Sequence, residues 1–299
     1  MIGINGITMY YGTLKSLDNV SIDIKDGSIF GLIGSNGSGK STLLRIMSGI
    51  IKPIHGEVTY DGICVFENND VKNSVAYLSD DQYFIPHSTI NDMKKLYKAV
   101  FTDFSDETFE RMKQIFGLDC DRKLNTFSKG MKKQASVMLA LSVKPKYLLC
   151  DETFDGLDPV VRQTVKRIIA EESAERGMTT IIASHNLREM EDICDTVGLL
   201  HKSELVFVRE LEDMKSDVRK VQVIYNHEFD PSSLSELNIS DIKIRGSVIS
   251  FIAHGTEETI NAVISATSPV FFECIPLTLE EIFINEMEVR GYDFSKIDY

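Results

Sequence analysis

The stretch GSNGSGKST at residues 34–42 decides the fold of this chain. Its three glycines let successive backbone N–H groups turn toward one anion, and the helix that follows adds the positive end of its dipole. An apolar strand runs into Gly34, and Leu43, Leu44 and Met47 recur at helical spacing after the stretch. This order of strand, loop and helix predicts a P-loop that holds a triphosphate, rather than a glycine-rich turn that binds nothing.

The P-loop pattern assigns roles to particular side chains. Lys40 is expected to reach the β- and γ-phosphates and to serve catalysis, and the Ser41 hydroxyl is expected to ligate Mg²⁺. The residues of this stretch that are expected to contact the nucleotide are Ser35, Asn36, Gly37, Ser38, Gly39, Lys40, Ser41 and Thr42.

A second motif, YLLCDE at residues 147–152, is an apolar strand that ends in two acids. Asp151 is expected to hold Mg²⁺, and Glu152 to orient or deprotonate the attacking water. An acidic strand terminus that merely faces solvent is the alternative. The position of the acids after the P-loop, behind four apolar residues, favours the catalytic interpretation.

The composition limits the classes of partner. The chain has 299 residues, which suggests about two domains. Its formal net charge of −13 argues against nucleic acid as a partner, because phosphate neutralisation needs Lys and Arg. The five cysteines are scattered without CxxC spacing and are expected to be reduced thiols. The N-terminal residues are not expected to form a signal peptide, and no run of about 18 apolar residues occurs in the sequence, so a membrane process is expected to need another chain for its membrane part.

Strand and helix patterns alternate along most of the chain. This alternation predicts an α/β fold with a mostly parallel sheet covered by helices. Residues from about 85 to 140 are helical and mixed in charge, as expected for an inserted helical subdomain. A boundary is predicted after residue 215. Residues 216–299 are predicted to form a small α+β appendage, with a hairpin that turns at Gly246 and a capping box of Thr278 and Glu281.

The stretch TFSKGMKKQ at residues 126–134, together with the two motifs above, makes the chain resemble the ATP-binding subunit of an ATP-binding-cassette (ABC) transporter. The family signature is LSGGQ, and Ser128 and Gly130 keep its serine and second glycine. Lys129 and Met131 replace a glycine and a glutamine, which puts the geometry or rate of the composite site in doubt. From local sequence alone, Ser128 is equally well explained as the N-cap of a helix.

The resemblance implies further site residues. FDGLD at residues 154–158 resembles the D-loop. Asp158 followed by Pro159 is also typical of a helix N-cap and a first-turn proline, and both interpretations can hold together. His185 follows a buried strand and resembles the switch histidine that contacts the γ-phosphate and helps to position the catalytic water.

The same resemblance suggests contacts for the adenine base and for the metal. Tyr11 is expected to stack on adenine, with Tyr10 as a near-equal candidate. In YLSDDQ, Asp80 aligns with the usual Q-loop glutamine and Gln82 lies two residues on. Which of the two senses Mg²⁺ and water is left open.

For the fold, the resemblance implies a P-loop NTPase cassette over residues 1–215. The cassette would have a RecA-like core, an N-terminal antiparallel β subdomain and the helical insert. PLTLEEIFINEM near the C-terminus resembles the tail of subunits that are paired with ABC-2-type exporters.

The function implied is ATP binding and hydrolysis that powers export of a peptide, antibiotic or other amphipathic compound. ATP and Mg²⁺ would be the cofactors. A membrane permease and a second ATP-binding subunit, identical or related, would be the partners, at the cytoplasmic face of the cell membrane. Two alternatives are a P-loop kinase, which would need an acceptor site and lid, and a soluble ABC-type clamp or scaffold that does not serve transport.

Overall fold

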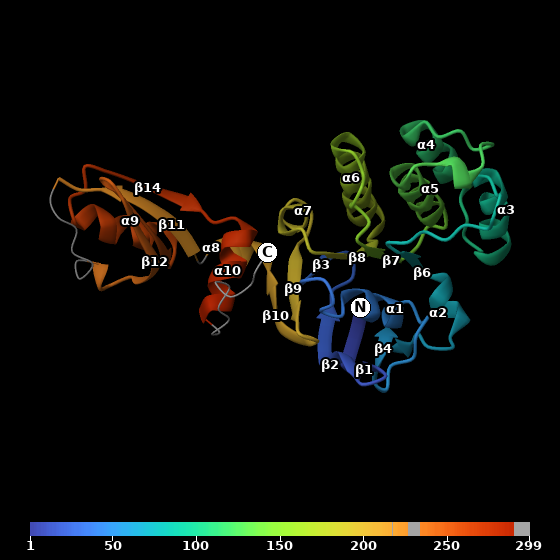
Figure 1. Ribbon diagram of the computed structural model, residues 1–299, viewed down its shortest axis with the longest axis horizontal. Helices are drawn as coiled ribbons and strands as arrows, with labels where there is room; N and C mark the ends of the chain where they lie inside the picture. Colours follow the sequence, from blue (N-terminus) through green and yellow to red (C-terminus); the bar gives the residue numbers. More distant parts are fainter. Residues whose placement is uncertain (217, 227–233, 290–299) are drawn as a thin grey trace. The chain divides into compact units, whose positions relative to one another are not determined.

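The computed structural model describes residues 1–216, 218–226 and 234–289. The chain divides into two compact units, Met1–Val208 and Arg209–Tyr299, and each is described by itself (Figure 1). The predicted boundary after residue 215 falls somewhat later, inside the short helix α8 (Leu211–Ser216). The assignment of an ATP-binding domain to residues 1–215 and an accessory domain to residues 216–299 stays a prediction.

A six-stranded sheet in the order β10-β9-β3-β8-β7-β6 forms the centre of the first unit. In this sheet β3 pairs in parallel with β8 and β9, and β7 pairs in parallel with β6 and β8. Every residue of β3, β7 and β8 is buried, as expected for parallel strands covered on both faces. The strands are β3 (Ile29–Ile33), β6 (Val75–Leu78), β7 (Tyr147–Asp151), β8 (Thr179–Ser184), β9 (Thr196–His201) and β10 (Glu204–Glu210).

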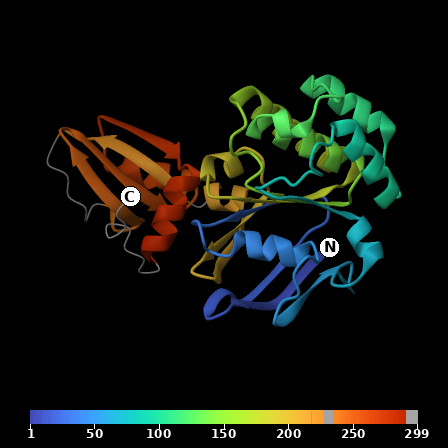
Figure 2. The same cartoon turned by 45° about the vertical axis from the view of Figure 1, so that its right-hand side comes forward.

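A second, antiparallel sheet in the order β2-β1-β4-β5 carries the N-terminus. Helix α1 (Lys40–Met47) lies between this sheet and the six-stranded one (Figure 2). One core cluster joins Leu43 and Leu44 of α1 to Ile4 in the antiparallel sheet and to Leu149 and Ile181 in the parallel sheet. The strands are β1 (Ile2–Tyr11), β2 (Leu14–Ile24), β4 (His55–Tyr60) and β5 (Ile63–Cys64).

Several helices of the first unit begin at a side-chain cap. The predicted helical insert contains three helices whose N-caps are Thr89, Ser105 and Ser128, each accepting a hydrogen bond from a backbone N–H three residues on. The helices are α2 (Asn69–Asn73), α3 (Ile90–Val100), α4 (Asp106–Phe116), the 3₁₀ turn η1 (Leu124–Thr126), α5 (Lys129–Ser142), α6 (Pro159–Arg176) and α7 (Leu187–Glu191).

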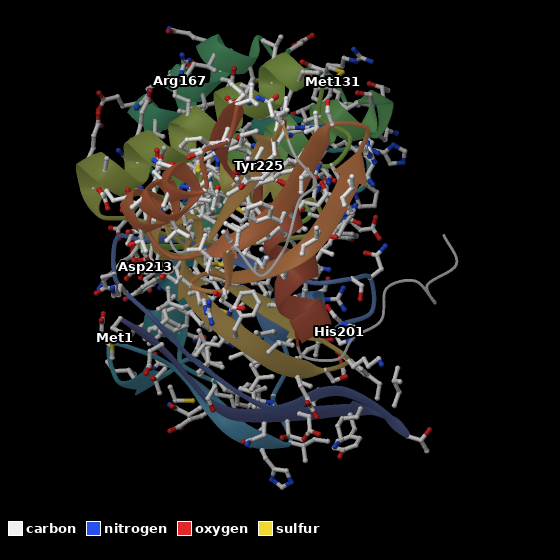
Figure 3. All side chains as sticks on the ribbon, turned by 90° about the vertical axis from the view of Figure 1, so that its left-hand side faces the viewer. Met1, Met131, Arg167, His201, Asp213 and Tyr225 are labelled. Atoms are coloured by element: carbon white, nitrogen blue, oxygen red, sulfur yellow. The ribbon has the colours of Figure 1, made fainter. Side chains whose placement is uncertain are left out.

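The second unit is a four-stranded antiparallel sheet in the order β12-β13-β11-β14. Its core packs alternate residues of the sheet, Val221, Val223 and Phe251, against Ile260 and Ile264 of α9. The Tyr225 hydroxyl (labelled in Figure 3) lies 2.7 Å from Thr267 Oγ1 and so joins the end of β11 to the end of α9. The elements are β11 (Val218–Ile224), β12 (Asn238–Arg245), β13 (Val248–His254), α9 (Glu257–Ala266), β14 (Phe271–Pro276) and α10 (Leu279–Val289).

Two local predictions for this unit are confirmed. Gly246 has a φ of 61° in the turn between β12 and β13. Thr278 and Glu281 form the expected capping box, because Thr278 N donates to Glu281 Oε2 at 3.1 Å and Glu281 N donates to Thr278 Oγ1 at 3.2 Å.

All five cysteines are free thiols, as predicted. Burial raises the pKa of Cys150 to about 12, so this thiol is unreactive at neutral pH. Within the described ranges, no helix has both the length and the apolar character needed to cross a membrane.

The packing of β7 predicts a large loss of stability on truncation. Leu149 is 0% exposed, so Leu149→Ala should lower the free energy of unfolding by about 2–5 kcal/mol. Leu14, the first residue of β2, is 69% exposed. Leu14→Ala should change the free energy of unfolding by less than about 0.5 kcal/mol. Denaturant titration followed by circular dichroism measures both, and equal midpoints for the two variants would contradict this account of the core.

Candidate functional site

The P-loop lies between the end of β3 and the start of α1, and its backbone passes close to two other strands. A Cβ atom at residue 34 would lie 2.2 Å from Leu200 O in β9, and one at residue 39 would lie 2.3 Å from Ser16 O in β2. Gly39 also has a φ of +109°, which strains any residue with a side chain. Only glycine fits at these positions, so the glycine pattern follows from the packing of the loop.

Lys40 is the buried cation of the site. Its side chain is 6% exposed, and Nζ donates to Gly34 O at 2.6 Å and to Ser35 O at 3.1 Å. The ammonium group also lies 3.7 Å from Glu152 Oε1. Burial lowers the pKa of Lys40, and the carboxylates of Glu152 and Asp151 oppose that shift. The structure therefore brings the P-loop lysine next to the second acid of the YLLCDE motif.

Asp151 connects the P-loop to two strands. Its Oδ1 accepts a hydrogen bond from Ser41 Oγ at 2.9 Å, and its Oδ2 accepts one from the Tyr77 hydroxyl at 3.1 Å. Burial is the larger cause and the nearby Asp151 charge the second, and together they raise the pKa of Tyr77 to about 12. Tyr77 therefore stays protonated and donates the hydrogen bond. Asp151 is 2% exposed, and these two hydroxyls fix the orientation of its carboxylate.

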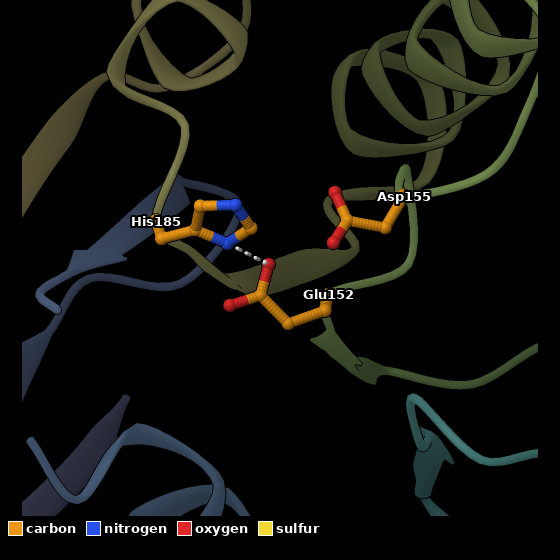
Figure 4. A group of neighbouring side chains, drawn as sticks. All are labelled: Glu152, Asp155 and His185. Atoms are coloured by element: carbon orange, nitrogen blue, oxygen red, sulfur yellow. Dashed lines mark hydrogen bonds and ion pairs between the residues drawn. The ribbon is translucent and has the colours of Figure 1, made fainter. Parts of the chain in front are cut away.

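Glu152, His185 and Asp155 converge on one point, and their side chains point toward one another in Figure 4. His185 Nδ1 lies 3.0 Å from Glu152 Oε2. One ligand-type atom of each of the three residues lies within 4.8 Å of the others. Glu152 has a φ of +46°, a conformation that is uncommon for a residue with a side chain and is often found at functional sites.

The Q-loop candidates make contacts within the chain. Asp80 Oδ1 lies 3.1 Å from Lys133 Nζ and 3.6 Å from Lys129 Nζ, both on α5. The Gln82 amide donates to Ser79 O at 2.7 Å and to Asp80 O at 2.9 Å. Both side chains are thus placed by neighbours of the loop, and the Mg²⁺-sensing role of either stays a prediction.

The signature stretch sits at the start of α5. Ser128 Oγ accepts a hydrogen bond from Met131 N at 3.2 Å, which is the capping role that local sequence predicted. Met131 is labelled on this helix in Figure 3. A Cβ atom at residue 130 would lie 3.0 Å from Gly156 O, so Gly130 lies against the predicted D-loop. Contacts of Ser128 and Gly130 with a nucleotide stay a prediction.

The remaining predicted residues are exposed at the end of a strand or cap a helix. Asp158 Oδ1 accepts hydrogen bonds from Val160 N and Val161 N at the start of α6, as its sequence context indicates. Tyr10 is 37% exposed and Tyr11 43% exposed at the end of β1. Both rings can be reached from solvent, and the choice between them as the adenine contact stays open.

The residues present suit a nucleoside triphosphate and Mg²⁺. Ser38 Oγ is buried in the P-loop and has no hydrogen-bond partner among the described residues, and a phosphate oxygen would supply one. Ser41 Oγ and Asp151 Oδ1 lie side by side, and hydroxyl and carboxylate oxygens are the ligands that Mg²⁺ prefers. Lys40 supplies the positive charge beside them.

Comparisons with known proteins agree with this geometry. Residues 17–155 match the ABC transporter family. The bacitracin transport ATP-binding protein BcrA of Bacillus licheniformis is 30% identical over 217 residues, which are 72% of this chain and 71% of that protein. The chain belongs to the ABC transporter ATP-binding family. The ABC transporter ATP-binding protein YtrB of Bacillus subtilis (strain 168) is 29% identical over 268 residues, 90% of this chain and 91% of that protein.

Solved ABC cassettes share the fold. A dimeric ATP-binding cassette in a post-hydrolysis state, bound to ADP and Pi, matches with a TM-score of 0.65 and 22% identity, over 71% of this chain and 99% of that chain. The P-loop NTPase cassette fold predicted from the sequence is confirmed. As a member of the ABC family, the chain is an ATP-binding protein and an ATPase.

Two residues of the site were not found from the sequence. Tyr77 lies in an apolar strand, and nothing in VAYL marks it as the donor to Asp151. Lys133 is the second of two lysines after the signature, and its burial against Asp80 and the Glu152 carbonyl depends on how α5 meets β7. The sequence signal that could have found Lys133 is its place among the apolar positions that α5 buries, where a charged residue is unusual.

The close backbone contact of Gly39 predicts a sharp effect on nucleotide binding. Gly39→Ala should weaken ATP binding at least tenfold, because the loop must move away from Ser16 O. Gly62→Ala is the matched control, since Gly62 also has a positive φ of 80° but no atom of the part of the chain that the structure describes lies within 4 Å of its Cβ position. Titration with a fluorescent ATP analogue should find near-parental affinity for Gly62→Ala, and unchanged affinity for Gly39→Ala would disprove the steric argument.

Proposed function

We propose that this chain is the ATP-hydrolysing subunit of an ABC exporter. In this proposal it works with a separate membrane permease and exports a peptide, an antibiotic or another amphipathic compound. The observation that carries the catalytic part is the convergence of Lys40, Ser41, Asp151, Glu152 and His185 at the ends of β3, β7 and β8.

The roles of these residues follow from their geometry. Lys40 would hold the β- and γ-phosphates, and Ser41 and Asp151 would hold Mg²⁺, which supplies neutralisation of the charge that develops on the phosphoryl oxygens. Glu152 would orient the attacking water. His185, at 3.0 Å from Glu152, would restrain that carboxylate and contact the terminal phosphate.

A sandwich of two subunits would complete the site. Ser128 and Gly130 of one subunit would contact the γ-phosphate held by the other, and the similar cassette bound to ADP and Pi is dimeric. Hydrolysis would remove that shared contact and let the pair open. Within each subunit, Tyr11 would stack on adenine, and Asp80 or Gln82 would report the state of the metal and water to the permease.

The export direction and the class of cargo have a separate basis. Relatives include the bacitracin transport ATP-binding protein of Bacillus licheniformis and the lantibiotic transport ATP-binding protein SrtF of Streptococcus pyogenes, which is 29% identical over 71% of this chain and 92% of that protein. The C-terminal PLTLEEIFINEM adds its resemblance to exporter subunits. We place the protein at the cytoplasmic face of the membrane, bound through its permease.

Substitution of Glu152 tests the catalytic assignment. Glu152→Gln keeps the shape of the side chain but removes the charge that directs water, so kcat should fall on the order of 10²-fold or more while ATP binding persists. Glu175→Gln on the exposed part of α6 is the control and should keep parental activity. Phosphate release measures turnover, and parental kcat in Glu152→Gln would rule out this role.

Isolation from membranes tests the transport assignment. The full chain, affinity-tagged and recovered from gently solubilised membranes, should bring with it a polytopic membrane protein in stoichiometric amount. Mass spectrometry identifies what accompanies it, and the soluble fraction of the same cells serves as the control. Recovery with ribosomes or with a soluble scaffold, and without a membrane protein, would replace transport by the clamp alternative.

A further inference from the structure

Lys133 is a charged side chain in the interior of the first unit. It lies one turn into α5, five residues after Ser128, and its side chain is 0% exposed. An ammonium group that is buried so completely is tolerated only where acceptors surround it. Lys133 Nζ has two such acceptors, Asp80 Oδ1 at 3.1 Å and the backbone carbonyl of Glu152.

The carbonyl that Lys133 contacts belongs to the residue proposed to direct the water. Glu152 has a φ of +46°, and its backbone is held from two sides: Glu152 N donates to Ala183 O at 3.0 Å, and Glu152 O accepts from Lys133 Nζ and from Asp155 N at 3.2 Å. The direction of a side chain follows from the backbone that carries it. The contact with Lys133 thus bears on where the Glu152 carboxylate points.

Asp80 supplies the counter-charge and links the contact to a second loop. Its carboxylate is 46% exposed and faces two lysines of α5, but only Lys133 is buried. Lys129, at 3.6 Å, is 62% exposed, and ion pairs of that kind contribute little. The Asp80–Lys133 pair therefore forms the stronger connection between the loop at residues 79–82, helix α5 and the end of β7.

We infer that Lys133 is a positioning residue for ATP hydrolysis. It holds the Glu152 backbone in the left-handed conformation that aims its carboxylate toward Lys40 and His185, and it ties this backbone to Asp80. Movement of the loop at residues 79–82 is then transmitted to the water-directing carboxylate through one side chain. The inference rests on the role proposed above for Glu152.

The test compares binding with turnover in the full chain. Lys133→Met removes the donor and the charge while it keeps an unbranched side chain in a buried place. Its kcat should fall tenfold or more, because small displacements of a catalytic group have effects of this size, while its Kd for ATP stays within about twofold of the parent. Lys133→Arg, which keeps charge and donors, should recover a substantial part of kcat. Lys95→Met, on an exposed part of α3, is the control and should match the parent in both quantities.

A double variant separates positioning from a general structural effect. If Lys133 acts through the Glu152 carboxylate, Lys133→Met should reduce kcat no further in the Glu152→Gln background. Parental kcat in Lys133→Met, or losses that multiply in the double variant, would overturn the inference. A lowered Tm together with lost ATP binding in both Lys133→Met and Lys133→Arg would assign Lys133 to folding alone and would overturn it as well.

Turnover of the Glu152→Gln variant distinguishes failure of the proposed Glu152 role from failure of the inference about Lys133. If Glu152→Gln keeps parental turnover, the proposed role of Glu152 fails, and with it the basis of the inference. If Glu152→Gln stops turnover and Lys133→Met does not alter kcat, only the inference about Lys133 fails.

Discussion

The site depends on the approach of the P-loop backbone to two strands that come from different sheets. Gly34 passes Leu200 O of β9, and Gly39 passes Ser16 O of β2, at distances that leave no room for a Cβ atom. These contacts clamp the loop between the antiparallel and the parallel sheets. Because the loop cannot relax, its N–H groups and the start of α1 remain directed at the position of the phosphates.

Fixing the loop also fixes the charges around it. Lys40 is buried and bound to two loop carbonyls, and the carboxylates of Glu152 and Asp151 oppose the lowering of its pKa by burial. Asp151 is oriented by the hydroxyls of Ser41 and Tyr77. Hydrogen bonds to a buried carboxylate hold its geometry while they stabilise its charge. These contacts therefore fix the positions of Lys40 and Asp151 relative to the loop.

A second set of contacts surrounds Glu152. Its side chain faces Lys40 and His185, and its carbonyl faces Lys133, which is paired with Asp80. Asp80 belongs to the loop at residues 79–82 and Lys133 to helix α5, so the two residues come from separate segments of the chain. In this chain the buried lysine brings both segments to the same glutamate.

The sequence anticipated much of the fold and of the site. The P-loop, the YLLCDE strand and the alternation of strands and helices rest on local patterns, because glycine conformation, burial and helical periodicity are written in neighbouring residues. The hairpin at Gly246 and the capping box of Thr278 and Glu281 were predictable for the same reason. Tyr77 and Lys133 were not, since neither has a sequence neighbour that indicates its partner.

By itself, then, the sequence determined which segments form strands, helices and the phosphate loop, and which acids and histidine end buried strands. It did not determine how those ends meet. The parallel pairing of β7 with β6 and β8 brings Tyr77 to Asp151 and His185 to Glu152, although each pair is far apart in the sequence. The burial of Lys133 was likewise decided by tertiary packing, because a charged side chain becomes buried only where distant acceptors are brought to it.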